Sequence, residues 1–341
     1  MDIKNEIDKE NLLETIKKIP DQLLEGPELV RSTVPKGDLN TFVISGMGGS
    51  ALVGDLLNTY LAATKIPKNK LRIIVNRTYQ LPEESFDNGS LNIISSYSGN
   101  TEEALANFEE ALKNDLNCLG MASGGKLLDI CNEKNIPYLL LPKPHHQFQP
   151  RMAYGYAFSA LLKYFSVLGL VNDTLNKLKD ASEKIKADLS VFGALGEDIA
   201  KKVKGKTPII YASDQYRFLA MIWKIMFNEN AKTPAFWNHL PELNHNEMVG
   251  FTLPQANFHF ILLRDRNDYS QNLRRFEKTA AILKEYNFDS TIIDIPEGEI
   301  IYQVFSSLQI GCFASYHLAL LYGIDPLPVA MVERFKKILA D

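Results

Sequence analysis

The sequence predicts an α/β protein that consists of two doubly wound parallel-sheet subdomains, each with helices on both faces of its sheet. The chain has 341 residues, a length that suits two α/β units of ~150 residues better than a single hydrophobic core. Short apolar runs alternate with amphipathic segments, as strands buried in a parallel sheet alternate with helices. A proline-rich segment, Leu141–Pro150, interrupts this alternation. We therefore predict an N-terminal subdomain over residues 1–150 and a C-terminal subdomain over residues 151–341.

The N-terminal half is predicted to begin with a helix that ends at Ile19-Pro20, followed by a second short helix. Apolar runs then predict five strands, over Thr41–Ser45, Leu71–Val75, Leu91–Ser95, Asn117–Met121 and Tyr138–Leu141. Amphipathic segments between them predict three helices, over Ala51–Ala63, Glu102–Lys113 and Lys126–Asn132. This alternation indicates a doubly wound sheet.

The C-terminal half is predicted to start with a helix over Met152–Gly169 and a polar helix that continues through Lys186. Strands are predicted over Pro208–Ser213, Phe258–Leu263 and Thr291–Ile295, with helices between them and an amphipathic helix at the C-terminus. The two halves share this alternation of strands and helices, but they show no obvious sequence repeat.

The composition argues against several classes of protein. The net charge is -4, and no long block of one sign occurs, so neither a nucleic acid nor an anionic membrane is indicated as partner. Three cysteines without a CxxC or Cys-His cluster suit buried thiols in a reducing cytoplasm. The charged N-terminus, Met1–Glu6, lacks the apolar core of a signal peptide. We see no run of ~18 uncharged apolar residues and expect a cytoplasmic protein without a membrane span.

A glycine-rich turn, Ser45–Ala51, follows the first predicted strand directly. Glycines allow the backbone to approach an anion, and the helix that follows directs its free N–H groups toward it. The segment matches neither the dinucleotide-binding fingerprint nor the P-loop. A tight turn that uses glycine for its geometry alone explains it equally well.

A second turn, Ser95–Glu103, again joins a buried strand to a helix. Ser96, Ser98 and Thr101 place three hydroxyl groups within six residues, and the backbone amides beside them add further donors. Such a nest can hold a phosphate dianion without any cationic side chain. Capping of the helix by Ser98 or Thr101 is the alternative, but it explains one hydroxyl and not three. We therefore favour anion binding at the ends of two neighbouring strands.

These two turns resemble those of the sugar isomerase (SIS) domain. Together with the motifs described next, nearly the whole chain resembles the bifunctional phosphoglucose/phosphomannose isomerase family. The resemblance implies that Gly49, Ser50, Ser96, Ser98 and Thr101 hold the phosphate group of the substrate.

Glu229 is the candidate base for moving a proton between C1 and C2, a step that aldose–ketose isomerisation requires. It follows an apolar helical segment, Phe218–Phe227, and its charge would be opposed by the helix dipole. A solvated glutamate paired with Lys232 or Lys224 is an equally good explanation from these residues alone. The resemblance assigns the base to this segment, Phe227–Lys232.

Three further residues receive roles from the resemblance. His245 lies in a polar loop between two asparagines that could set its tautomer, and it would open the sugar ring from across a dimer interface. Arg151 follows the proline-rich segment and would stabilise the enediolate. Lys336, in preference to Lys337, would contact the ring oxygen. Without the resemblance, all three are more simply surface residues. No histidine pair has metal-ligand spacing, so neither a metal nor a cofactor is expected.

The resemblance therefore implies an enzyme that interconverts glucose 6-phosphate, and also mannose 6-phosphate, with fructose 6-phosphate by a metal-free enediol mechanism. The expected assembly is a homodimer. Two alternatives remain at this point: a non-catalytic sugar-phosphate-binding regulator, and an isomerase of another phosphosugar. A binding module would not need Glu229, His245 and Arg151 together. The sequence does not decide the preference between glucose and mannose.

Overall fold

The computed structural model describes residues 6–30, 35 and 37–340. The residues Met1–Asn5, on which the expectation about a signal peptide mainly rests, lie outside this part. The chain divides into two compact units. The five-stranded unit comprises Lys18–Lys186 and Glu299–Ile301, and the four-stranded unit comprises Met1–Lys17, Ala187–Gly298 and Tyr302–Asp341.

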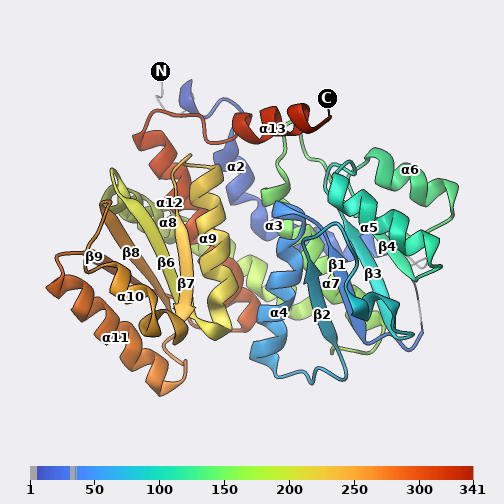
Figure 1. Cartoon of the computed structure of the whole chain (residues 1–341), viewed down its shortest axis with the longest axis horizontal. Helices are drawn as coiled ribbons and strands as arrows, with labels where there is room; N and C mark the ends of the chain where they lie inside the picture. The colour runs from blue at the N-terminus through green and yellow to red at the C-terminus, as the bar shows by residue number, and fades with distance from the viewer. Residues whose placement is uncertain (1–5, 31–34, 36, 341) are drawn as a thin grey trace. The chain divides into compact units, whose positions relative to one another are not determined.

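The five-stranded unit is built on a parallel sheet with the order β2-β1-β3-β4-β5. Figure 1 labels four of these strands, β1 to β4. Its strands are β1 (Thr41–Ser45), β2 (Arg72–Asn76), β3 (Ser90–Ser95), β4 (Cys118–Ala122) and β5 (Tyr138–Leu140). The helices are α3 (Ile19–Glu25), α4 (Leu52–Thr64), α5 (Glu102–Lys113), α6 (Gly125–Glu133) and α7 (Tyr154–Val167). The five predicted strands and the three helices predicted between them are thus present, with ends that differ by a few residues. The helix predicted to end at Ile19-Pro20 instead stops at Lys17, and α3 begins at Ile19.

Helices cover both faces of this sheet, because successive residues of each strand point to opposite faces. On one face, the rings of Phe42 in β1 and Phe165 in α7 lie 4.6 Å apart between centroids. On the other face, Ile94 of β3 shares an apolar cluster with Phe108 of α5 and Leu127 of α6. The fold class predicted from the sequence is confirmed.

The helices that follow two neighbouring strands pack on opposite faces of the sheet. β1 leads into α4 on one face, and β3 leads into α5 on the other face (Figure 1). The carboxyl ends of β1 and β3 therefore form a topological switch point, which is where open α/β sheets bind their ligands.

The division between the units falls at Lys186 inside the long helix α8 (Leu175–Val203), later than the predicted boundary at residue 150. The apolar helix α7 explains the difference. It is buried on most of its surface and packs on β1 through Tyr164 and Phe165. Gln22 of α3 also donates to the carbonyl of Met152, at 2.7 Å. These contacts attach residues 151–186 to the first sheet.

The four-stranded unit has a parallel sheet with the order β7-β6-β8-β9. Its strands are β6 (Thr207–Ser213), β7 (Phe236–Leu240), β8 (Phe258–Arg264) and β9 (Asp289–Asp294). Its helices include α2 (Leu12–Lys17), α9 (Arg217–Glu229), α10 (Glu247–Gly250), α11 (Ser270–Glu285), α12 (Ile300–Leu321) and α13 (Ala330–Ala340). The edge strand β7 was not predicted, because its residues include Asn238 and His239 among the apolar ones.

Helix α12 is the one described helix that is long and apolar enough to cross a membrane by length and composition. Its 22 residues include none of Asp, Glu, Lys or Arg, so the expectation that no uncharged apolar run of ~18 residues occurs is wrong for this segment. Within the protein, 83% of its most apolar window is buried. Trp223 of α9 donates to the carbonyl of Ser307 in α12, at 3.0 Å. These properties are those of a core helix in a folded protein.

Candidate active site

The two predicted anion-binding turns lie at the switch point and are hydrogen-bonded to each other. The Tyr97 N–H donates to Ser50 Oγ at 2.9 Å, and Ser95 Oγ donates to the Ser50 carbonyl at 2.7 Å. Ser50 therefore links the glycine-rich turn after β1 to the serine-rich turn after β3. The two segments, 45 residues apart in sequence, form one nest of donors.

The hydroxyl groups of the second turn are not used to cap helix α5. Thr101 occupies the N-cap position, but its side chain makes no capping hydrogen bond. Its Oγ1 instead lies 2.8 Å from Ser96 Oγ, which also accepts from the Thr101 N–H at 3.3 Å. Ser98 Oγ accepts from the Asn100 N–H at 3.2 Å. Thr101 therefore does not cap α5 with its side chain, and the first N–H groups of this helix receive no hydrogen bond from it.

Glycine is required at two points of the nest. Gly99 has a φ of +72°, and a Cβ there would lie 1.8 Å from the Gly124 carbonyl oxygen. A Cβ at Gly49 would lie 2.5 Å from the backbone nitrogen of Arg151. The first contact packs the serine-rich turn onto the loop after β4. The second brings the segment that carries Arg151 against the glycine-rich turn, so Gly49 serves a close approach of two backbones.

Arg151 lies in a short 3-10 helix, Pro150–Met152, and its residue is only 2% exposed. It is therefore not the surface arginine that the sequence alone suggested. Tyr97 anchors the same region, because its hydroxyl donates to the Pro142 carbonyl at 2.8 Å. Burial raises the pKa of Tyr97 far above its ordinary value, so this hydroxyl stays protonated and keeps its donor.

Glu229 is the last residue of α9 and is half-buried. The next residue, Asn230, is completely buried and donates from Nδ2 to Ser315 Oγ of α12 at 3.0 Å. Asn228 Nδ2 donates to the Thr233 carbonyl at 2.9 Å. Both neighbours of Glu229 are thus held in place, which restrains the backbone from which its side chain extends.

His245 is exposed at the end of a 3-10 helix, Glu242–His245. The two flanking asparagines, which the sequence suggested as partners of the imidazole, bond elsewhere. Asn244 Nδ2 donates to Thr279 Oγ1 at 2.9 Å, and Asn246 Nδ2 donates to Glu242 Oε1 at 2.6 Å. Through these bonds the asparagines stabilise the loop that presents the imidazole.

Lys336 lies on α13, and its ammonium is 2.8 Å from Glu333 Oε1. Its side chain is 64% exposed, so within one chain it is a surface lysine. It belongs to the four-stranded unit together with Glu229 and His245, whereas Arg151 and the nest belong to the five-stranded unit. Among the described residues, no three His, Cys, Asp or Glu side chains gather as they would around a metal ion.

Sequence reasoning missed several residues that shape the nest. Ser95 and Tyr97 link the two turns, and the loop Ser123–Gly125 supports Gly99. A signal for the loop was available, because two adjacent glycines follow the strand β4 closely.

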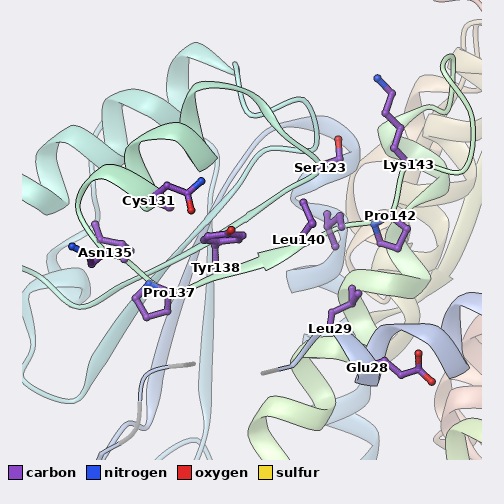
Figure 2. Close-up of a pocket in the computed structure, with 13 residues that line it drawn as sticks. Glu28, Leu29, Ser123, Cys131, Asn135, Pro137, Tyr138, Leu140, Pro142 and Lys143 are labelled. Atoms are coloured by element: carbon purple, nitrogen blue, oxygen red, sulfur yellow. The ribbon is translucent and has the colours of Figure 1, made fainter. Parts of the chain in front are cut away.

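A cavity of about 960 Å³ opens beside the edge strand β5. Figure 2 shows its wall, which includes Cys131, Asn135 and Tyr138 on one side and Leu140 and Lys143 on the other. Of its lining residues, Ser123 contacts the nest, through a hydrogen bond of 2.7 Å from its Oγ to the Tyr97 carbonyl. None of the predicted phosphate-binding residues lines this cavity.

Comparison with known proteins places the chain in a family. Residues 194–339 match the model of the bacterial phospho-glucose isomerase C-terminal SIS domain. A bifunctional phosphoglucose/phosphomannose isomerase of Caldicellulosiruptor bescii is 33% identical, over 97% of this chain and 99% of the relative. A D-glucosamine-6-phosphate 4-epimerase of Sulfolobus acidocaldarius is 28% identical, over 86% of each chain.

Among solved structures, a hypothetical protein of Thermus thermophilus superimposes with a TM-score of 0.73 at 16% identity. The match covers 95% of this chain and 89% of that protein, and at this identity the likeness concerns the fold. The near-complete match to the Caldicellulosiruptor protein is the decisive finding. The chain belongs to the bifunctional phosphoglucose/phosphomannose isomerase family.

Proposed function

We propose that the protein interconverts glucose 6-phosphate and mannose 6-phosphate with fructose 6-phosphate. Family membership and the nest at the switch point support this together. One observation carries the proposal. Hydrogen bonds bring the turns of Ser50, Ser96 and Thr101 together as an uncharged cluster of donors at the place where α/β sheets bind ligands. The protein would act in the cytoplasm as a homodimer on small hexose 6-phosphates.

The nest binds the phosphate group of the substrate. Ser50, Ser96, Ser98 and Thr101 offer hydroxyl groups, and the N–H groups that begin α5 add the positive end of a helix dipole. The hydroxyl groups of Ser96 and Thr101 bond to each other, and Ser98 Oγ accepts from a backbone N–H. Phosphate oxygens, which are strong acceptors, bind the hydroxyl protons of this nest.

Four side chains carry out the reaction in this proposal. His245, contributed by the second subunit, opens the sugar ring with assistance from Lys336. Glu229 removes the proton from one of the two carbons C1 and C2 and returns it to the other. Arg151 stabilises the enediolate that forms between these steps. Its burial supports that role, because a guanidinium interacts more strongly with an anion in a medium of low dielectric constant.

The assay uses chelator-treated protein with mannose 6-phosphate and, separately, with fructose 6-phosphate, and follows glucose 6-phosphate through a coupled dehydrogenase. A phosphoglucose isomerase is added to the mannose sample. Signal from both substrates is the expected result. Signal from fructose 6-phosphate alone would restrict the enzyme to glucose. No signal from either, with sugar-phosphate binding intact, would contradict the proposal in favour of a regulator or another phosphosugar.

The base is tested with Glu229→Gln, which keeps the size of the side chain and removes its basicity. Turnover should fall by about 10²–10⁴-fold, while fructose 6-phosphate still binds in a calorimetric titration. Glu285→Gln is the matched control, because Glu285 is likewise the last residue of a helix, α11. Normal turnover in the Glu229 variant would remove this residue from the mechanism.

The contribution of His245 across the interface is tested by mixing Glu229→Gln and His245→Gln subunits. If each site takes its histidine from the partner, a mixed dimer contains one site with both native residues and recovers activity. If each site is built from one chain, every site in the mixture lacks one residue and no activity returns.

A further inference from the structure

The end of helix α9 contains a lysine where a glycine is the usual residue. The Thr233 N–H bonds to the Phe227 carbonyl at 3.2 Å, across six residues, and Lys232 between them has a φ of +51°. A residue in this left-handed conformation just after the end of a helix is most often glycine. A lysine there costs backbone free energy that glycine would not. We therefore expect the lysine side chain to make interactions that offset this cost.

The ammonium of Lys232 contacts three backbone carbonyl oxygens. It donates to those of Glu229 at 2.7 Å and Asn230 at 3.3 Å, and to that of Pro326 at 2.8 Å. The first two belong to the end of α9, where carbonyl groups lack partners within the helix and carry the negative end of its dipole. An ammonium has three N–H donors, so one side chain serves all three oxygens.

The third contact joins α9 to a distant segment of the same unit. Pro326 is 94 residues from Lys232 in sequence and precedes the C-terminal helix α13. Leu327 beside it is 1% exposed, and its N–H bonds to Asp325 Oδ1 at 3.0 Å. The segment 325–328 is thus an ordered partner, and Lys232 is a direct bridge from it to the backbone of Glu229.

We propose that Lys232 is a positioning residue, whose ammonium fixes the backbone of Glu229 against the segment 325–328 and so orients the Glu229 carboxylate for proton transfer. This inference rests on the proposed function of Glu229. Lys232 itself does not touch the substrate. Its loss should therefore lower kcat and leave KM nearly unchanged, because the phosphate is bound by the nest and not by Lys232.

The test is Lys232→Gly. Glycine is the preferred residue at this backbone position, so the helix end is retained and the strain is relieved, while the ammonium is lost. We expect kcat to fall by roughly 10- to 100-fold, as small misplacements of reacting groups do, and the melting temperature to stay the same or rise. Lys232→Met, which keeps the strained backbone and removes the charge, should show the same loss of kcat.

Chemical rescue separates positioning from a general structural effect. Ethylammonium carries three N–H donors and should restore part of the kcat of Lys232→Gly. Tetramethylammonium has the same charge but no N–H donor, and it should not. The control variant is Lys65→Gly, because Lys65 is exposed and has the same left-handed conformation at the end of α4, with a φ of 55°. Its kcat should be unchanged.

A wild-type kcat in Lys232→Gly, or equal responses to the two ammonium ions, would overturn the inference. Failure of the proposed function is distinguishable from this result. If Glu229→Gln retains turnover, the base assignment is wrong irrespective of Lys232. If Glu229→Gln is inactive and Lys232→Gly is normal, the inference about Lys232 alone fails. The double variant should be no slower than Glu229→Gln, because the two residues act through one group.

Discussion

The stability of the four-stranded unit should depend on pH through one buried histidine. His259 lies in β8 and is 3% exposed. Its Nε2 is 2.9 Å from Thr291 Oγ1, and its Nδ1 has no hydrogen-bond partner among the described residues. Burial first, and then the charge of Lys206, lowers the pKa of His259 from 6.5 to about 4, although Asp289 acts in the opposite direction. The folded protein therefore keeps this imidazole neutral where the unfolded chain protonates it.

The magnitude follows from proton linkage. Between pH 7 and pH 5 the unfolded chain takes up about 0.7 proton at His259, whereas the folded protein takes up about 0.1. With the two pKa values of 6.5 and about 4, the unfolding free energy should fall by about 2 kcal/mol over this range. The loss begins as the pH falls through 6.5 and stops growing below about 4. It is a substantial part of a typical stability of roughly 5–15 kcal/mol.

The perturbation is His259→Gln, whose terminal amide can still reach Thr291 but does not titrate. Urea unfolding is followed by tryptophan fluorescence at pH 7 and pH 5. The two tryptophans of the chain, Trp223 and Trp237, both lie in the four-stranded unit, so the signal reports on the unit that contains His259.

The wild type should lose about 2 kcal/mol more than His259→Gln between the two pH values. His146→Gln replaces an exposed histidine and should behave like the wild type. Equal losses in the wild type and His259→Gln would refute the reasoning, because they would mean that His259 protonates equally in both states.

Three further predictions concern the nest and the thiols. Gly99→Ala should abolish calorimetric binding of fructose 6-phosphate, because its Cβ would overlap the Gly124 carbonyl oxygen, whereas Gly205→Ala, with φ +77° and no atom within 4 Å, should bind normally. Thr101→Val keeps the side-chain volume but removes a hydroxyl, so the dissociation constant should rise by about tenfold, equivalent to ~1.4 kcal/mol; an unchanged constant would exclude Thr101 from the nest. Burial raises the pKa of Cys118 to about 12 and of Cys131 to about 11, so a disulfide reagent at pH 8 should react with these thiols only after unfolding, and rapid reaction of the native protein would contradict their burial.

Much of the fold could be predicted from the sequence because local patterns carry it. Strands buried on both faces are nearly continuous apolar runs, and β1 and β3 were both recognised this way. The turns that follow them were recognised by their glycines and hydroxyl residues. These are properties of short segments, so they do not depend on what the segments contact.

Only the tertiary structure decided how these segments are used. β7 pairs with β6 alone and contains polar residues, so its strand character comes from backbone bonds to a neighbour and not from its own pattern. The unit boundary moved to Lys186 because α7 buries its apolar surface on the first sheet. Gly49 adjoins Arg151 across about a hundred residues of sequence, a contact that no local pattern encodes.

The chemistry of the candidate site divides in the same way. The sequence alone determined which residues could bind a phosphate or move a proton, because those capacities belong to the side chains themselves. Tertiary structure decided that the Ser96 and Thr101 hydroxyl groups bond to each other instead of capping a helix. It also decided that the Lys232 ammonium donates to the Pro326 carbonyl. Such pairings depend on the distances between segments far apart in the chain, and these distances exist only after the apolar strands and helices have packed.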